Sequence, residues 1–245
     1  MSRLIRISIL FVMLLSTAAI GPVQAAGMAV GPAGYTFCAR QGGTCIFRGT
    51  GGVAFGAAGH FNYKVVVNHV GCNKTIFGDP LPGTKEACYY KVVARPGRRQ
   101  GTYFTSYGYN DNDDGNGHFG TAAIAYPDSH HAIATEGKGS YSDPITFATD
   151  RREIPPHTMI YVPYLQKYFF MEDGCSECSS DWNNGHRWRT DLFMGGNTAL
   201  QPEPALDDCE SEITRNAVMY INAGPGFPVD VQPLFAGGVC TARGH

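Results

Sequence analysis

Three features of the sequence predict an all-β protein. Its apolar runs are short and rich in Val, Ile, Tyr and Phe, for example 63–67, 89–93 and 159–162. The chain has 31 Gly and 15 Pro residues, many of them in turn-forming clusters between these runs. Helical periodicity is nearly absent, and the best helix candidate is the segment 206–216. We therefore expect many short strands joined by tight turns.

The first 26 residues have the three parts of a secretory signal peptide. Arg3 and Arg6 form a basic start, residues 7–15 are apolar, and the segment 23–25 offers a small-residue cleavage site. The apolar run is too short to span a membrane, and no later run is longer. We expect a secreted, extracellular protein without a membrane span, with the periplasm or the cell wall as alternative locations.

The charge balance argues against nucleic acid as the partner. The chain carries 19 Lys and Arg against 21 Asp and Glu, and loss of Arg3 and Arg6 with the signal leaves 17 against 21, a net charge of −4. Phosphate backbones are bound by basic surfaces. The same net charge gives no electrostatic help in binding acidic wall polymers.

The cysteines indicate two disulfide-linked units. An even number of cysteines in an exported protein favours disulfides, whereas the Cys175-Ser176-Glu177-Cys178 spacing alone could also suit zinc. No second close pair of Cys or His residues accompanies that spacing, so we expect no metal and no cofactor. In the first unit we predict the pairs Cys38–Cys45 and Cys72–Cys88. The eight cysteines are Cys38, Cys45, Cys72, Cys88, Cys175, Cys178, Cys209 and Cys240.

Composition divides the mature chain into two parts. Residues 35–93 read as a small Cys-rich β module, which could bind carbohydrate through exposed aromatic rings or simply bury those rings in its core. Residues 94–101 are basic, contain Pro and Gly, and are predicted to be a linker. Residues 102–245 form the larger domain, which ends in a Pro/Gly-rich tail.

Three aspartates in the larger domain lie at the edges of strand-like runs. Asp150 precedes Ile154-Pro155, Asp173 ends an apolar run, and Asp191 begins another. Asp150 could instead start a turn, and Asp191 could be structural, bonding to backbone amides. Glu172 should point away from Asp173, because neighbouring residues in a strand face opposite sides.

The order and spacing of these residues resemble the bacterial three-Asp (3D) domain, which shows an Asp, three residues, Ile-Pro, and then a Thr and a strand containing Tyr. Here Asp150, Ile154-Pro155, Thr158 and Tyr161 stand at those positions, and Glu172-Asp173 and Asp191 match the later elements. The resemblance implies a six-stranded double-psi β-barrel, the fold of lytic transglycosylases, rare lipoprotein A and expansins. The chain departs from the pattern after Asp173, where a longer, Cys-bearing segment replaces the usual Thr-Gly-Gly.

In the transglycosylases the second aspartate is the catalytic acid/base, so the resemblance implies this role for Asp173, supported by Asp191 and Asp150. We expect a protein that acts on cell-wall or extracellular polysaccharide or peptidoglycan, by lytic cleavage or by hydrolysis. The alternative is a non-catalytic, expansin-like polysaccharide-binding or wall-loosening protein. A secreted protein-binding effector is a third class, because fold does not fix function. We expect a monomer.

Aromatic residues supply the candidate substrate contacts. Trp182 and Trp188 are the only tryptophans and could form a stacking platform beside the aspartates or lie in the core. Tyr161 is the third candidate contact. The segment 110–117 is similar to a calcium loop, but Thr121 stands where the EF-hand pattern needs Glu, so we expect a solvated turn.

Overall fold

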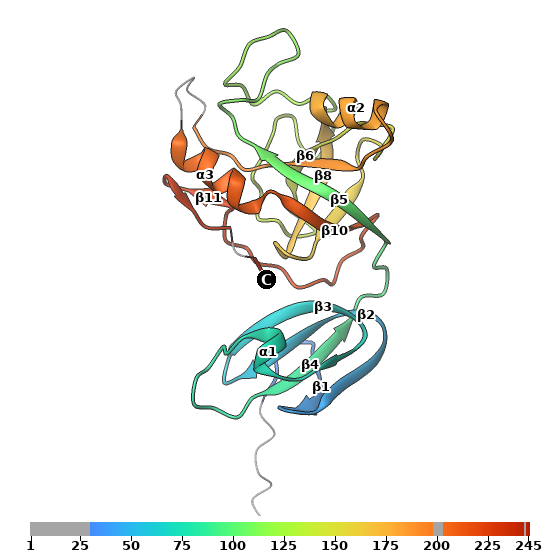
Figure 1. Cartoon of the computed structure of the whole chain (residues 1–245), viewed down its shortest axis with the longest axis vertical. Helices are drawn as coiled ribbons and strands as arrows, with labels where there is room; N and C mark the ends of the chain where they lie inside the picture. The colour runs from blue at the N-terminus through green and yellow to red at the C-terminus, as the bar shows by residue number, and fades with distance from the viewer. Residues whose placement is uncertain (1–29, 198–202, 243) are drawn as a thin grey trace, which may run out of the picture.

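The computed structural model describes residues 30–197, 203–242 and 244–245. The predicted signal peptide lies outside the described residues. The described chain is mostly β and forms a four-stranded sheet, a closed six-stranded barrel and a two-stranded sheet, as the sequence predicts. Figure 1 shows the barrel and the four-stranded sheet as two bodies joined by the chain between β4 and β5.

The N-terminal unit is an antiparallel sheet in the order β1-β4-β2-β3. Its core is small and includes Val53, Phe55 and Phe77, and two disulfides lie against it. The disulfides Cys38–Cys45 and Cys72–Cys88 confirm the predicted pairing. The elements are β1 (Thr36–Arg40), β2 (Thr44–Ala57), β3 (His60–Gly71), α1 (Lys74–Phe77) and β4 (Ala87–Val92).

The barrel closes in the order β10-β5-β9-β6-β8-β7, with β10 also paired to β7. Two of its strand pairs are parallel, β5 with β9 and β6 with β8, so chain connections cross over the barrel. Its strands are β5 (Arg98–Tyr107), β6 (Ile145–Ala148), β7 (Met159–Val162), β8 (Lys167–Asp173), β9 (Arg189–Phe193) and β10 (Arg215–Ile221). The predicted linker is shorter than expected, because β5 already begins at Arg98.

Two helices and a short hairpin cover the outside of the barrel. The helix α2 (Ser176–Asn183) follows β8, in a segment that the sequence indicated only as a polar loop. The helix α3 (Pro204–Ile213) overlaps the predicted helix 206–216 and starts without a side-chain cap. The strands β11 (Phe235–Ala236) and β12 (Val239–Cys240) form the hairpin. The disulfide Cys209–Cys240 ties this hairpin to α3, and Cys175–Cys178 closes the start of α2.

The segment after β10 runs along the side of the barrel that faces the four-stranded sheet (Figure 1). It contributes Phe227 to an aromatic cluster with Tyr161, Tyr168 and Tyr220. The side-chain amide of Gln166, in the barrel, donates to the carbonyl of Tyr63 in β3 at 3.0 Å. Apolar packing and this hydrogen bond therefore connect the two bodies.

Among the residues that the structure describes, no helix has both the length and the hydrophobicity that a membrane span requires.

Candidate functional site

Asp173 ends the buried strand β8, and its side chain is 8% exposed. Three donors orient its carboxylate: the amides of Ala125 and Gly174 bond to Oδ1 at 3.0 and 2.8 Å, and the Tyr107 hydroxyl bonds to Oδ2 at 3.1 Å. Burial raises the pKa of Asp173 to about 6, although all three hydrogen bonds oppose that rise. A carboxyl in this state can give and take a proton near neutral pH.

Asp191 in β9 belongs to the same row of residues across the barrel. Ala148 in β6 pairs with Asp191 on one side and with Asp173 on the other. Two interstrand spacings put the Cα atoms of the two aspartates about 10 Å apart, and β8 has a bulge between Met171 and Asp173 at this point. Thr105 in β5 pairs with Asp191 and donates its hydroxyl to Oδ1 at 2.6 Å. Burial also raises the pKa of Asp191 to about 6.

Tyr107 lies between the two carboxylates. Burial, and then the charges of Asp173 and Asp191, hold the pKa of its hydroxyl well above the usual value, so the group remains a hydrogen-bond donor. Tyr107 was not predicted as a site residue, because nothing in its local sequence distinguishes it from an ordinary core residue. Its hydrogen bond to Asp173 joins residues 66 positions apart, which no local pattern reveals.

An open pocket of about 210 Å³ gives access to Asp173. The loop after β5 supplies one wall with Asp113 and Asp114, and Ile124 and Ala125 supply another. Asp113 contributes to the raised pKa of Asp173. The pocket thus places a protonatable carboxyl among further acidic groups.

The calcium-like segment 110–117 forms part of this wall. Asp113 accepts the amide of Gly115 at 2.6 Å, and Asp114 accepts the amide of Asn116 at 2.8 Å, so these side chains bond to their own turn. Within the described parts of the chain, no group of three or more His, Cys, Asp or Glu residues is arranged to hold a metal ion.

Asp150 stands two residues after Ala148, at the same edge of the barrel, but its charge is already paired. The Arg152 guanidinium bonds to both carboxylate oxygens at 2.8 and 2.6 Å, and the Arg152 amide bonds to Oδ1 at 2.7 Å. These hydrogen bonds hold the pKa of Asp150 well below its usual range. Its carbonyl accepts the amides of Glu153 and Ile154, so Asp150 starts a turn. This geometry favours the turn interpretation over a catalytic one.

Glu172 has different partners from Asp173, and a bulge in β8 at these residues interrupts the regular alternation of a strand. Its Oε2 contacts Nδ1 of His131 at 2.8 Å and accepts the Thr146 hydroxyl at 2.9 Å. Burial raises the pKa of Glu172. His131 therefore belongs to this buried pair, and His130 contacts Asp128 at 3.3 Å.

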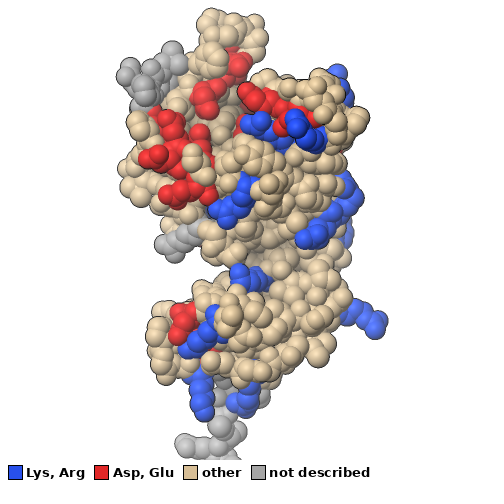
Figure 2. All heavy atoms as spheres, viewed as in Figure 1, with Lys and Arg blue, Asp and Glu red and all other residues tan. Residues whose placement is uncertain are grey.

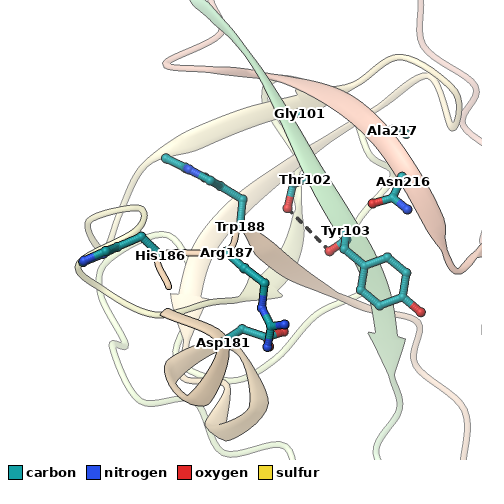
Figure 3. A pocket seen from close by; sticks show the side chains of 9 residues that line it. All are labelled: Gly101, Thr102, Tyr103, Asp181, His186, Arg187, Trp188, Asn216 and Ala217. Atoms are coloured by element: carbon teal, nitrogen blue, oxygen red, sulfur yellow. Dashed lines mark hydrogen bonds and ion pairs between the residues drawn. The ribbon is translucent and has the colours of Figure 1, made fainter. Parts of the chain in front are cut away.

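Trp182 and Trp188 contact each other edge to face, with ring centroids 5.7 Å apart. Trp188 lines a hollow of about 630 Å³, shown in Figure 3, whose lining residues do not include Asp173 or Asp191. Trp188 is also partly buried against the barrel core. The structure thus brings the two tryptophans together, but in a different hollow from the pocket at Asp173.

The prediction that Tyr161 contacts substrate is wrong. Its side chain is fully buried, and its ring stacks on that of Phe227 with the ring centroids 4.1 Å apart. Its hydroxyl donates to the carbonyl of Pro228 at 2.7 Å. The segment after β10 covers it, so no ligand can reach the ring.

Comparisons with known proteins identify the barrel as a family domain. A protein of Dictyostelium discoideum, "Uncharacterized protein DDB_G0273701/DDB_G0273221", is 31% identical over 120 residues, which cover 48% of this chain and 51% of that protein. "Uncharacterized protein L701" of Acanthamoeba polyphaga mimivirus is 40% identical over 67 residues, 26% of this chain and 32% of that protein.

The chain thus aligns with about half of the first relative's length and a third of the second's. No solved structure matches it. Residues 99–241, from β5 to the end of the hairpin, match the family described as the DDB_G0273701 N-terminal domain. That match covers more than half of the 245 residues, and the chain belongs to this family.

Proposed function

We propose that this chain is a secreted double-psi β-barrel protein that cleaves a cell-wall or extracellular polysaccharide, with Asp173 as the acid/base. The observation that carries the proposal is a carboxyl whose pKa burial raises to about 6 and which lines an open pocket. The closed six-stranded barrel with two parallel strand pairs is compatible with a double-psi topology. The four disulfides suit an oxidising, extracellular compartment.

In this mechanism protonated Asp173 donates its proton to the glycosidic oxygen as the bond to the anomeric carbon breaks. The resulting carboxylate then removes a proton from a hydroxyl of the same sugar, which bonds to the anomeric carbon and closes a ring. Tyr107 and the two backbone amides hold the Asp173 side chain in place in its protonated and its ionised form. Asp191 supports Asp173 through Tyr107, because the charges of both carboxylates raise the pKa of the Tyr107 hydroxyl and keep it a donor to Asp173.

The test uses purified chain with peptidoglycan, chitin and cellulose, with new chain ends counted and the products analysed by mass spectrometry. Asp173→Asn keeps an acceptor for both backbone amides and removes the proton transfer, so the rate should fall by about 10²–10⁴-fold. The matched control is Asp143→Asn, an exposed aspartate of the same domain, which should be as active as wild type.

An Asp173→Asn variant as active as wild type would remove Asp173 from the mechanism. No new ends on any substrate, together with retention of the chain on an insoluble polysaccharide, would instead support the non-catalytic, expansin-like alternative. In that case the buried aspartates would be structural.

A further inference from the structure

The hollow at Trp188 lies on the barrel surface where β5 and β10 pair. Gly101, Thr102 and Tyr103 of β5 form one side, and Asn216 and Ala217 of β10 lie next to them. The end of α2 and the chain leading into β9 form the other side (Figure 3). A Cβ atom built on Gly101 would meet nothing within 4 Å, so the space above this residue is open.

Aromatic rings form two walls of this hollow. Tyr103 is 38% exposed, and Figure 3 shows its ring projecting away from β5 with the hydroxyl outermost. Trp188 stands on the other side, in contact with Trp182. Sugar rings present apolar faces that stack on such side chains, so the walls suit a saccharide unit.

Arginine side chains surround the same rings. The Arg98 guanidinium lies 5.3 Å from the centroid of the Trp188 ring, and that of Arg189 lies 6.0 Å from the centroid of Tyr103. Arg187 is exposed and pairs with Asp181, which also contacts Arg189 at 3.8 Å. Among the described residues that line the hollow, Asp181 is the one carboxylate. Arg187 lines the hollow and Arg98 and Arg189 lie beside its rings, and Asp181 contacts Arg187 and Arg189 but not Arg98.

Two further acidic groups lie near Arg189. Glu153 accepts the backbone amide of Arg189 at 3.1 Å, and burial raises its pKa to about 8, so it is mostly uncharged at neutral pH. The charge of Asp191 interacts with that of Arg189, and also with those of Asp111 and Glu177. Among the described residues Arg98 has no carboxylate partner, and its guanidinium bonds to the side chain of Gln100.

We propose that this hollow binds an acidic sugar unit, such as a uronic acid within a polysaccharide. The ring would stack on Trp188 or Tyr103, and the carboxylate would pair with Arg98 and Arg187, since guanidinium groups bind carboxylates through two parallel hydrogen bonds. This inference rests on the proposed function for its ligand class, a polysaccharide. It adds that the bound sugar unit is negatively charged, which the chain's own net charge of −2 does not suggest.

A uronate fits this surface better than a nucleic acid does. Figure 2 shows acidic side chains gathered on the part of the barrel near α2 and α3, while Lys and Arg lie along its flank and on the four-stranded sheet. A nucleic acid carries one charge per phosphate and needs an extended basic track. A patch of three arginines beside an acidic region offers no such track, but it is large enough for the carboxylate of one sugar unit.

The experiment titrates the full chain with an oligogalacturonate and, separately, with a neutral cello-oligosaccharide of equal length. Trp188 lines this hollow and Trp182, the other tryptophan of the chain, contacts it, so intrinsic tryptophan fluorescence reports on the hollow. The uronate should change the fluorescence saturably, with a dissociation constant at least about tenfold below that of the neutral oligomer, and the difference should shrink in 1 M salt.

Three variants locate the binding. Arg98→Gln should weaken uronate binding by about fivefold or more through loss of a charged hydrogen bond, and the matched control Arg40→Gln, on an exposed position of β1, should not. Gly101→Leu places a side chain in open space and should block the hollow, whereas Gly101→Ala should bind as wild type. Both Gly101 variants should keep the wild-type melting temperature, which separates blocking from unfolding.

Equal affinity for the uronate and the neutral oligomer would overturn the inference, as would a single-stranded oligonucleotide that binds as tightly as the uronate. Asp173→Asn separates this inference from the proposed function. That variant should lose cleavage and keep the fluorescence titration. A chain that cleaves a polysaccharide but shows no uronate binding would retain the proposed function and lose the acidic-sugar site.

Discussion

The pocket at Asp173 and the hollow at Trp188 lie on one barrel and differ in almost every property. The pocket is small, about 210 Å³, and acidic, with Asp113 and Asp114 beside a carboxyl of raised pKa. The hollow is about 630 Å³ and is walled by aromatic rings and arginines. The difference indicates that one barrel face is suited to proton transfer and another to holding a chain. A net charge of −2 describes neither region.

The largest expected effect that separates the two regions is the pH dependence of cleavage. Asp173 must be protonated to start the reaction, and burial raises its pKa to about 6, so kcat/KM should approach a tenfold fall per pH unit above that value and drop about 50-fold between pH 6 and pH 8. Binding at the hollow should change little, because arginine stays charged throughout. Initial rates on an uncharged substrate measure the first quantity, and fluorescence titrations measure the second. A flat rate profile over this range would contradict the role of Asp173.

A smaller effect, on the stability of the fold, should distinguish Asp191 from Asp150. Burial raises the pKa of Asp191 to about 6. Its contribution to the stability of the fold is therefore fully present only below its unfolded pKa and is lost as pH rises through 6. Asp191→Asn removes this charge and keeps an acceptor for Thr105. We expect the variant to be more stable than wild type by about 1–2 kcal/mol at pH 8 and no more stable at pH 4.

Asp150 should behave in the opposite way. The Arg152 guanidinium holds the pKa of Asp150 below the usual range. The contribution of Asp150 to the stability of the fold is therefore present above its unfolded pKa and is lost as pH falls from there toward the lower folded pKa. Asp150→Asn should therefore cost about 1–2 kcal/mol at pH 8. Urea unfolding of the wild type and both variants at pH 4 and pH 8 measures these differences. An Asp150→Asn variant more stable than wild type at pH 8 would instead group Asp150 with the buried aspartates Asp173 and Asp191.

Local patterns predicted much of this architecture. Short β-rich runs indicated the strands, and cysteine spacing indicated Cys38–Cys45 and Cys72–Cys88, because each of these pairs closes a short loop. Asp173 and Asp191 were expected near each other because strand ends of a barrel meet at its rim, and both pair with Ala148.

Long-range contacts explain what the sequence could not show. Tyr161 was expected to contact substrate, but a segment more than sixty residues later covers it. The tryptophans were expected beside the aspartates because they follow Asp173 in sequence. The helix α2 intervenes, and Trp188 lies in the other hollow. The Asp150–Arg152 ion pair is local, but the sequence does not show whether a turn at these residues lies beside an active site.

Two tyrosine hydroxyls offer the smallest and most selective test of the comparison. In Tyr107→Phe, Asp173 loses a hydrogen bond that lowers its pKa, so the midpoint of the cleavage profile should move upward by less than about one pH unit. In Tyr161→Phe, the buried carbonyl of Pro228 loses its donor, which should cost about 1–2 kcal/mol of stability and leave the midpoint unchanged. Both variants remove one oxygen atom from a buried ring, so the pair is internally matched. A midpoint that moves in Tyr161→Phe, or stays fixed in Tyr107→Phe, would show that the profile does not report on Asp173.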